Sequence, residues 1–249
     1  RPESYHAKVR ARAQSAGGFE SIHERVTSKE EGLERYLRYD RYDRHAFRTF
    51  FFTAAKTWED FAALRLEESP GWAAGRYRAG EPKDDGGIFT RTGPLAVEED
   101  SLEIFLQKEF TLAAEGGGER LSCALKLDCM QGSGRFRLGL EMILNLLAGH
   151  APDRYYRAAD WREALDWEGE RILPGALGLR DEWLQLDLEL TANPLPGRWW
   201  LAPIFTVSQS EEGFEKVYQG SAILPVWDLD LKTADSWEGS LALTIRTIR

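Results

Sequence analysis

The sequence has few cysteines, no excess of positive charge and no long apolar run, and each absence excludes a class of protein. Two cysteines in 249 residues exclude a small scaffold held together by disulfides. A formal charge of −9 argues against nucleic-acid binding, which needs an excess of lysine and arginine. No apolar run approaches the ~18 residues of a membrane span, and the first residues contain no signal-peptide core. We therefore expect neither nucleic acid nor a membrane as partner.

The two cysteines lie on the same predicted strand. Cys123 and Cys129 are in phase with the apolar residues of that strand, so both face the same side. Six positions at about 3.3 Å each separate them too far for a disulfide. We interpret them as buried free thiols, which favours a reducing compartment and a cytoplasmic location. Because the chain begins with Arg1 and not with Met, we expect a fragment, which leaves a removed signal sequence open.

Apolar and polar residues alternate with period two after Pro70. The clearest examples are 121–129 and 184–190, each with one apolar and one polar face, as in an antiparallel sheet. Gly116 to Gly118, between two strands, is typical of a hairpin connection. Further strands are expected near 88–92, 104–112, 136–146, 217–224 and 241–248. The pattern predicts a mainly β protein, a large antiparallel β-sandwich.

The N-terminal part has a helical pattern. The first ~20 residues are expected to be irregular, and Ser28 to Glu31 match a capping box. An apolar stripe with helical spacing follows from Leu33 to Phe51 and predicts one long helix against a sheet. A second, shorter helix is expected at Thr57.

The length allows a full core within one unit. We expect 1–249 to be a single β-sandwich domain, with lead-in and helices in 1–66 and strands in 67–249.

Three segments, taken together, resemble a known enzyme family. Pro203 to Gly220 combines two strand patterns with the polar turn Ser-Glu-Glu-Gly and with Tyr-Gln-Gly. It resembles the C-terminal β-domain of family 57 glycoside hydrolases, which include 4-α-glucanotransferases and α-amylases. Ser21 to Glu24, with the charged continuation to Phe52, is similar to the same family. Arg135 to Leu146 is more loosely similar to the family's aromatic-Gly-x-Glu-x-Asn strand.

The resemblance implies a galactose-mutarotase-like sandwich. In this family a nucleophile and a general acid lie in an N-terminal α/β barrel and perform a retaining reaction on α-1,4-glucans. No alternation of strands and helices is seen here, so we expect the barrel to be absent. The resemblance therefore implies a noncatalytic domain with no catalytic residue, no metal and no cofactor. Its expected partners are the catalytic barrel of the same polypeptide and an α-glucan oligosaccharide.

His23 and Glu24 form the first candidate contact for a sugar or for the barrel. Adjacent residues on a strand point to opposite faces, so they serve one site only if a turn redirects them. The alternative is a structural hydrogen bond to a buried backbone group. From the residues we favour the structural interpretation, and the resemblance adds some support to the functional one, since the family has a His-Glu pair here.

Glu141 and Asn145 form the second candidate. A carboxylate in an apolar strand must be paired or hydrogen-bonded. Glu141 could bind sugar hydroxyls on a concave sheet, hold loops in place, or act as the base of a mutarotase-like epimerase. The last alternative requires a histidine acid opposite the base. Spacing does not choose among the four histidines, which are His6, His23, His45 and His150.

A polar set around the turn of the first matched segment forms the third candidate. It consists of Ser208, Ser210, Glu211, Tyr218 and Gln219. No histidine lies in sequence reach, so the serines form no nucleophilic triad. The set either caps the turn or contacts the barrel or an oligosaccharide. Three nearby aspartates lack the Gly and terminal Glu of a calcium loop and are expected in solvent; they are Asp228, Asp230 and Asp235.

Aromatic residues are numerous, with nine tryptophans and eight tyrosines. Their rings could stack on sugars, but they more often fill the interior of a large sandwich. Trp199 and Trp200 are the stronger candidates for sugar contact, and the second cluster is Tyr155, Tyr156, Trp161 and Trp167. A stand-alone carbohydrate-binding module that uses exposed aromatics is therefore an alternative function.

Overall fold

The computed structural model describes residues 3–15, 32–40, 42–66, 71–97, 100–210 and 213–248. Strands make up most of this part of the chain. The helical elements are α1 (His6–Ser15), the 3-10 turn η2 (Leu33–Tyr36) and α2 (Trp58–Ala62). None of the helices within the described ranges is long and apolar enough to span a membrane.

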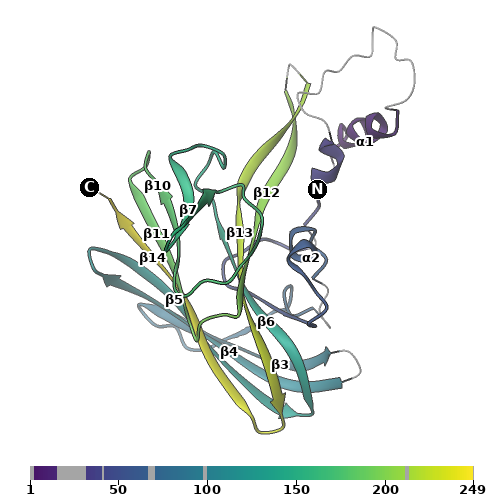
Figure 1. Ribbon diagram of the computed structural model, residues 1–249. Helices are drawn as coiled ribbons and strands as arrows, with labels where there is room; N and C mark the ends of the chain where they lie inside the picture. Colours follow the sequence, from purple (N-terminus) through teal and green to yellow (C-terminus); the bar gives the residue numbers. More distant parts are fainter. Residues whose placement is uncertain are drawn as a thin grey trace.

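The strands form two antiparallel sheets, which face each other in Figure 1. The five-stranded sheet contains, in spatial order, β1 (Arg48–Phe52), β6 (Ser133–Leu144), β13 (Gly213–Lys232), β12 (Arg198–Ser210) and β9 (Gly169–Arg171). The nine-stranded sheet contains β2 (Arg78–Ala79), β3 (Gly86–Val97), β4 (Asp100–Glu115), β5 (Gly118–Gln131), β14 (Ser236–Thr247), β11 (Leu186–Asn193), β10 (Leu177–Asp181), β7 (Arg154–Ala158) and β8 (Trp161–Ala164).

The main core lies between the sheets. Ile104 and Leu127 of the nine-stranded sheet pack in one cluster with Leu138 and Ile223 of the five-stranded sheet, and all four are 0% exposed. Alternate residues of the five-stranded sheet point the other way, into a second cluster covered by α2 and the N-terminal segment. This two-layer arrangement confirms the predicted antiparallel β-sandwich.

Several local predictions are confirmed. Gly116 and Gly117 form the β4–β5 turn with φ of 58° and 80°, which glycine adopts without strain. Cys123 and Cys129 are buried free thiols on β5. At the start of α2, Thr57 and Asp60 form a reciprocal capping box.

The predicted long helix is wrong where the structure describes it. Leu33–Tyr36 is a single 3-10 turn, and Arg48–Phe52 is strand β1, paired with β6. Phe51 points into the core between the sheets, whereas Phe50 and Phe52 point into the second cluster. A strand buries successive residues on opposite faces, which a helix with one apolar stripe cannot do. Helix α1 instead forms in the expected lead-in, and the predicted capping box at Ser28–Glu31 lies outside the described residues.

We expect Gly132→Ala to be far more destabilising than Gly117→Ala. Both glycines have positive φ, 87° and 80°. A Cβ at Gly132 would lie 2.2 Å from the carbonyl oxygen of Ser101, whereas a Cβ at Gly117 meets nothing within 4 Å. Gly117→Ala should cost about 1 kcal/mol of unfolding free energy, and Gly132→Ala about 3 kcal/mol or more. Urea unfolding measures both values, and equal losses would contradict the expectation.

Candidate functional site

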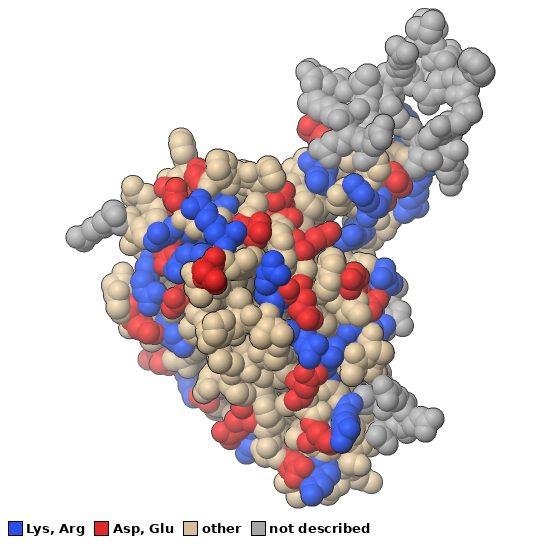
Figure 2. All heavy atoms as spheres, in the orientation of Figure 1, with Lys and Arg blue, Asp and Glu red and all other residues tan. Residues whose placement is uncertain are grey.

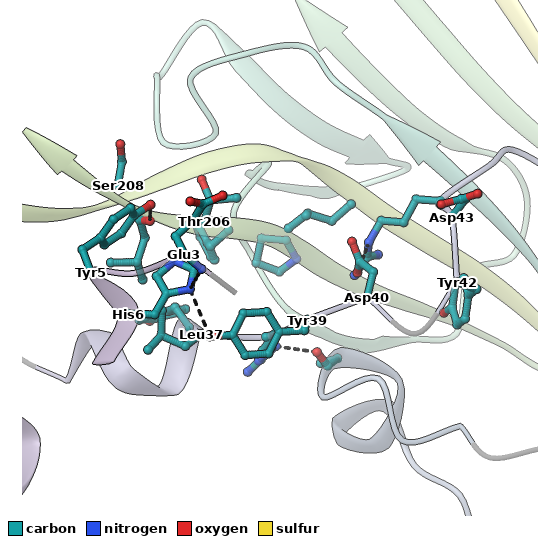
Figure 3. A pocket seen from close by; sticks show the side chains of 18 residues that line it. Glu3, Tyr5, His6, Leu37, Tyr39, Asp40, Tyr42, Asp43, Thr206 and Ser208 are labelled. Carbon is teal, nitrogen blue, oxygen red and sulfur yellow. Dashed lines mark hydrogen bonds and ion pairs between the residues drawn. The ribbon is translucent and has the colours of Figure 1, made fainter. Parts of the chain in front are cut away.

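A groove of about 900 Å³ lies between the N-terminal segment and β12. Residues from 3–6, 36–40 and 42–44 form one wall, and residues 203–208 of β12 form the other. Figure 3 shows the labelled side chains spread along the strand, with Ser208 and Tyr5 at one end and Asp43 at the other. We call this feature the N-terminal groove.

The groove exists because the end of the β12–β13 ribbon is packed against the N-terminal segment. The ribbon rises beyond the two sheets, and α1 lies beside it (Figure 1). Val207 and Phe214 of the ribbon are buried in a small cluster with Val9 of α1 and Leu33 of η2. A β-bulge between Ile204 and Phe205 shifts the pairing register just before this contact.

Hydrogen bonds connect the residues at one end of the groove. The backbone N–H of Glu3 donates to Nδ1 of His6 at 3.0 Å, so a neutral His6 carries its proton on Nε2. The Tyr39 hydroxyl lies 3.0 Å from the same Nδ1 and therefore acts as a donor to it (Figure 3). The Tyr5 hydroxyl donates to the carbonyl oxygen of Val207 at 2.9 Å and ties the wall to β12.

A buried carboxylate lies beside the other end of the groove. Glu141 of β6 is 0% exposed, and neither carboxylate oxygen has a hydrogen-bond partner in the described part of the chain. The Arg44 guanidinium lies 3.8 Å from Oε1 and is also bonded to Asp40 at 2.7 Å. Burial raises the Glu141 pKa to about 7, against the opposing effect of Arg44 and Arg48.

The third predicted set is partly brought into the groove. Ser208 and Thr206 line the groove. The Nε2 of Gln219 donates a hydrogen bond to the Thr206 hydroxyl at 3.1 Å. Tyr218 instead packs against the main core. Its hydroxyl lies 2.6 Å from Ser221 Oγ, which donates to the Leu165 carbonyl, and burial raises the Tyr218 pKa to about 12.

Some predicted candidates lie outside the described residues. They are His23, Glu24, Glu211 and the side chain of Ser210.

The structure does not bring Glu141 and Asn145 together. Asn145 follows the end of β6, is exposed, and accepts a hydrogen bond from the backbone N–H of Leu147 at 2.8 Å. It therefore caps the turn, where Leu147 has a positive φ of 57°. A side chain in the turn after a strand no longer follows the strand alternation, so Asn145 does not lie on the same face as Glu141, although four positions separate them.

Trp199 and Trp200 offer no face to a sugar. Both are 0% exposed, and they fill opposite sides of the five-stranded sheet. Adjacent strand residues alternate in direction, so a sheet buried on both faces buries both indoles. In the second aromatic cluster Tyr156 stacks on Trp161 at 6.0 Å, and these rings also belong to the main core.

The main residues that the sequence analysis missed are those of the N-terminal wall. Glu3, Tyr5 and Tyr39 line the groove, as does Asp43. A usable signal was the spacing of Tyr36, Tyr39 and Tyr42, which are three residues apart with charged residues between them. Among the residues that the structure describes, no group of three or more His, Cys, Asp or Glu side chains could hold a metal ion.

The charges on the visible face are mixed. Figure 2 shows Lys and Arg intermingled with Asp and Glu, without a stripe of one sign on that face.

The family is decided by comparison with known proteins. Residues 1–241 match the family model described as "Alpha-amylase/4-alpha-glucanotransferase, C-terminal". The chain belongs to this family. A curated member, Alpha-amylase 1 of Dictyoglomus thermophilum, is 31% identical over 258 residues. The match covers 99% of this chain but 34% of that protein, so the chain spans about a third of its relative.

Solved structures agree on the fold of this alpha-amylase/4-alpha-glucanotransferase C-terminal chain. The 4-alpha-glucanotransferase of Thermococcus litoralis aligns with a TM-score of 0.65 and 18% identity, covering 93% of this chain and 31% of that one. A GalM/aldose epimerase homologue from C. elegans aligns with a TM-score of 0.54 and 11% identity, covering 72% and 71%. At these identities the likeness concerns the fold alone.

We expect the wild type to lose stability as the pH rises to neutrality, and Glu141→Gln to abolish this loss. A carboxyl whose folded pKa is raised destabilises the fold when it ionises, so stability falls as pH rises from about 4.5 to about 7. Relative to Glu141→Gln, the wild type should lose about 3 kcal/mol of unfolding free energy between pH 4.5 and 8. Urea unfolding across this pH range measures the difference.

Arg44→Met is the matched control for this prediction. It removes the cation nearest to Oε1 of Glu141, so the Glu141 pKa should rise further, and the loss of stability should become larger and extend to higher pH. Parallel stability curves for wild type and Glu141→Gln over the whole range would show that Glu141 does not titrate as described.

Proposed function

We propose that this chain is the noncatalytic C-terminal domain of a family 57 α-amylase or 4-α-glucanotransferase acting on α-1,4-glucans. The domain supports a catalytic barrel in the same polypeptide and contributes contacts to the oligosaccharide. The parent uses a retaining mechanism with two carboxylates of the barrel. The free buried thiols Cys123 and Cys129 support a reducing, cytoplasmic location.

One observation carries this proposal: the match covers nearly all of this chain but only about a third of the relative's length. The remaining length of the relative is sufficient for a separate catalytic barrel. Within the described part of this chain, Glu141 is the carboxylic acid that most resembles a catalytic acid or base, because its pKa is raised to about 7. Its side chain is 0% exposed, so a glycosidic bond cannot reach it.

The composition of the N-terminal groove supports a contact with oligosaccharide. Rings of Tyr36 and Tyr39 provide flat surfaces for sugar rings, and the Thr206 and Ser208 hydroxyls can exchange hydrogen bonds with sugar hydroxyls. The elongated arrangement along β12 suits a chain of several sugar units (Figure 3). The catalytic barrel itself is proposed from the family and not from the groove.

An epimerase reaction is less well supported. It was argued from the mutarotase-like fold and from Glu141 as base, but fold alone does not determine activity. The charged groups that act on Glu141 are Arg44, Arg48 and Asp40, and no histidine is among them in the described part of the chain. The carbohydrate-binding module remains a competing proposal, which calorimetry on the isolated chain addresses.

The first test concerns the division of labour. The 249-residue chain alone should release or transfer no sugar from maltoheptaose. A longer polypeptide that joins the chain to a family 57 barrel should do so, because the reacting carboxylates belong to the barrel. Chromatography of the products measures both. Turnover by the chain alone would refute the noncatalytic assignment.

The second test concerns the groove. Tyr39→Ala removes a ring from the wall and should weaken maltoheptaose binding by about tenfold, which corresponds to ~1.4 kcal/mol. The matched variant Tyr39→Phe keeps the ring and loses only the hydroxyl with its hydrogen bonds to His6 and Arg10, so its effect should be smaller. Isothermal titration calorimetry measures both dissociation constants. Unchanged affinity in Tyr39→Ala would remove the groove from the proposal.

A further inference from the structure

A second cavity, of about 600 Å³, opens at the edge of the sandwich. Its walls are residues 42–49, which include the start of β1, residues 72–77, and side chains of β3 and β4. Tyr42 and Asp43 line both this cavity and the N-terminal groove, so the two spaces lie on either side of one segment. We call this second cavity the edge cavity.

Aromatic rings form much of the edge cavity. Trp72, Tyr77, Phe89 and Phe110 all line it. Phe89 packs edge-on against Phe110 with 5.7 Å between ring centroids, and Trp72 Nε1 donates to the Pro94 carbonyl at 3.0 Å. These contacts fix the rings in place. A fixed apolar wall of this kind suits a ligand with a flat C–H face.

A buried cation lies in the same wall. Lys108 is 5% exposed, and its ammonium donates to the carbonyl oxygen of Phe47 at 2.9 Å and lies 4.5 Å from the Tyr77 ring centroid. Burial of a lysine is costly and uncommon. The neighbouring guanidinium of Arg48 also lines the cavity, and its buried Nε–H has no hydrogen-bond partner among the described residues.

A buried hydroxyl completes the polar set. Thr49 lines the cavity, is 1% exposed, and its Oγ1 has no hydrogen-bond partner in the described part of the chain. A buried hydroxyl without a partner destabilises a fold, whereas valine has the same shape and no such cost. A threonine at this position therefore indicates a partner that arrives from outside the chain.

We propose that the edge cavity binds a glucose unit of an α-glucan, separately from the N-terminal groove. A sugar hydroxyl exchanges a hydrogen bond with Thr49, while the C–H face of the ring packs on the aromatic wall. The choice of glucose rests on the proposed function. A simple anion would use Arg48 and Lys108, but it would gain nothing from the aromatic wall, so we favour the sugar.

Thr49→Val tests this inference because the variant should bind sugar more weakly and yet be more stable without sugar. The variant loses a hydrogen bond to the ligand, so maltose should bind about fivefold more weakly. Without sugar, the variant loses an unsatisfied buried hydroxyl, so its Tm should rise by about 2 °C. Both are measured in the 249-residue chain carrying Tyr39→Ala, which weakens the contribution of the groove, by titration calorimetry and by thermal unfolding.

Thr244→Val is the matched control. Thr244 is also 1% exposed, but its hydroxyl accepts a hydrogen bond from Arg120 at 3.3 Å, and it does not line the edge cavity. This variant should lower Tm and leave the maltose affinity unchanged. If Thr49→Val lowers Tm as Thr244→Val does and keeps full affinity, Thr49 is only structural and the inference fails.

Further outcomes separate this inference from the proposed function. Absence of heat with maltose overturns the edge-cavity site, and saturable heat with inorganic phosphate but not with maltose identifies an anion site and also overturns it. Activity on maltoheptaose is assayed separately in the longer polypeptide with the barrel. If the longer polypeptide without substitutions shows no activity, the proposed function is contradicted. If the longer polypeptide is active but the 249-residue chain does not bind maltose, only the edge-cavity site is contradicted.

Discussion

Burial of both faces of the five-stranded sheet is the constraint on which the rest of the structure depends. Trp199 points into the core between the sheets, and Trp200 points into the second cluster on the other side. The outer face is too apolar to remain in water, and it is covered by α2 and the N-terminal segment. Both cavities result from this covering layer, because it wraps along β12 and over the sheet edge instead of lying flat.

The covering layer also explains where the unusual charges are found. Glu141 lies beneath this layer, and Arg48 and Lys108 line the edge cavity. Burial there raises the pKa of Glu141 and leaves the Thr49 hydroxyl without a partner among the described residues. Each of these costs is small against the apolar area that the layer buries, so the fold tolerates them. A ligand that hydrogen-bonds to such a buried polar group removes its cost, so binding there adds the most stabilisation.

The fold was predictable because strands have a local signature. Period-two alternation in 121–129 gave the strand, the face and the free thiols together, and Gly116 and Gly117 gave the turn. The N-terminal segment was not predictable in the same way. Its apolar residues have helical spacing, but Phe50, Phe51 and Phe52 are recruited to a sheet edge by pairing with β6, which is distant in sequence. Tertiary pairing there overrides local periodicity.

The candidate site could likewise be predicted from sequence only in part. Ser208 and Gln219 were chosen from sequence and lie at the groove, whereas Trp199 and Trp200 were chosen for their rings and lie in the core. Sequence alone determined the antiparallel sandwich and the family resemblance, because alternation and motif are properties of neighbouring residues. Only the tertiary structure decided which aromatics are buried, that Glu141 is inaccessible, and that Thr49, Lys108 and Trp72 share one cavity. Those facts depend on which distant segment covers which face, and no local pattern encodes that choice.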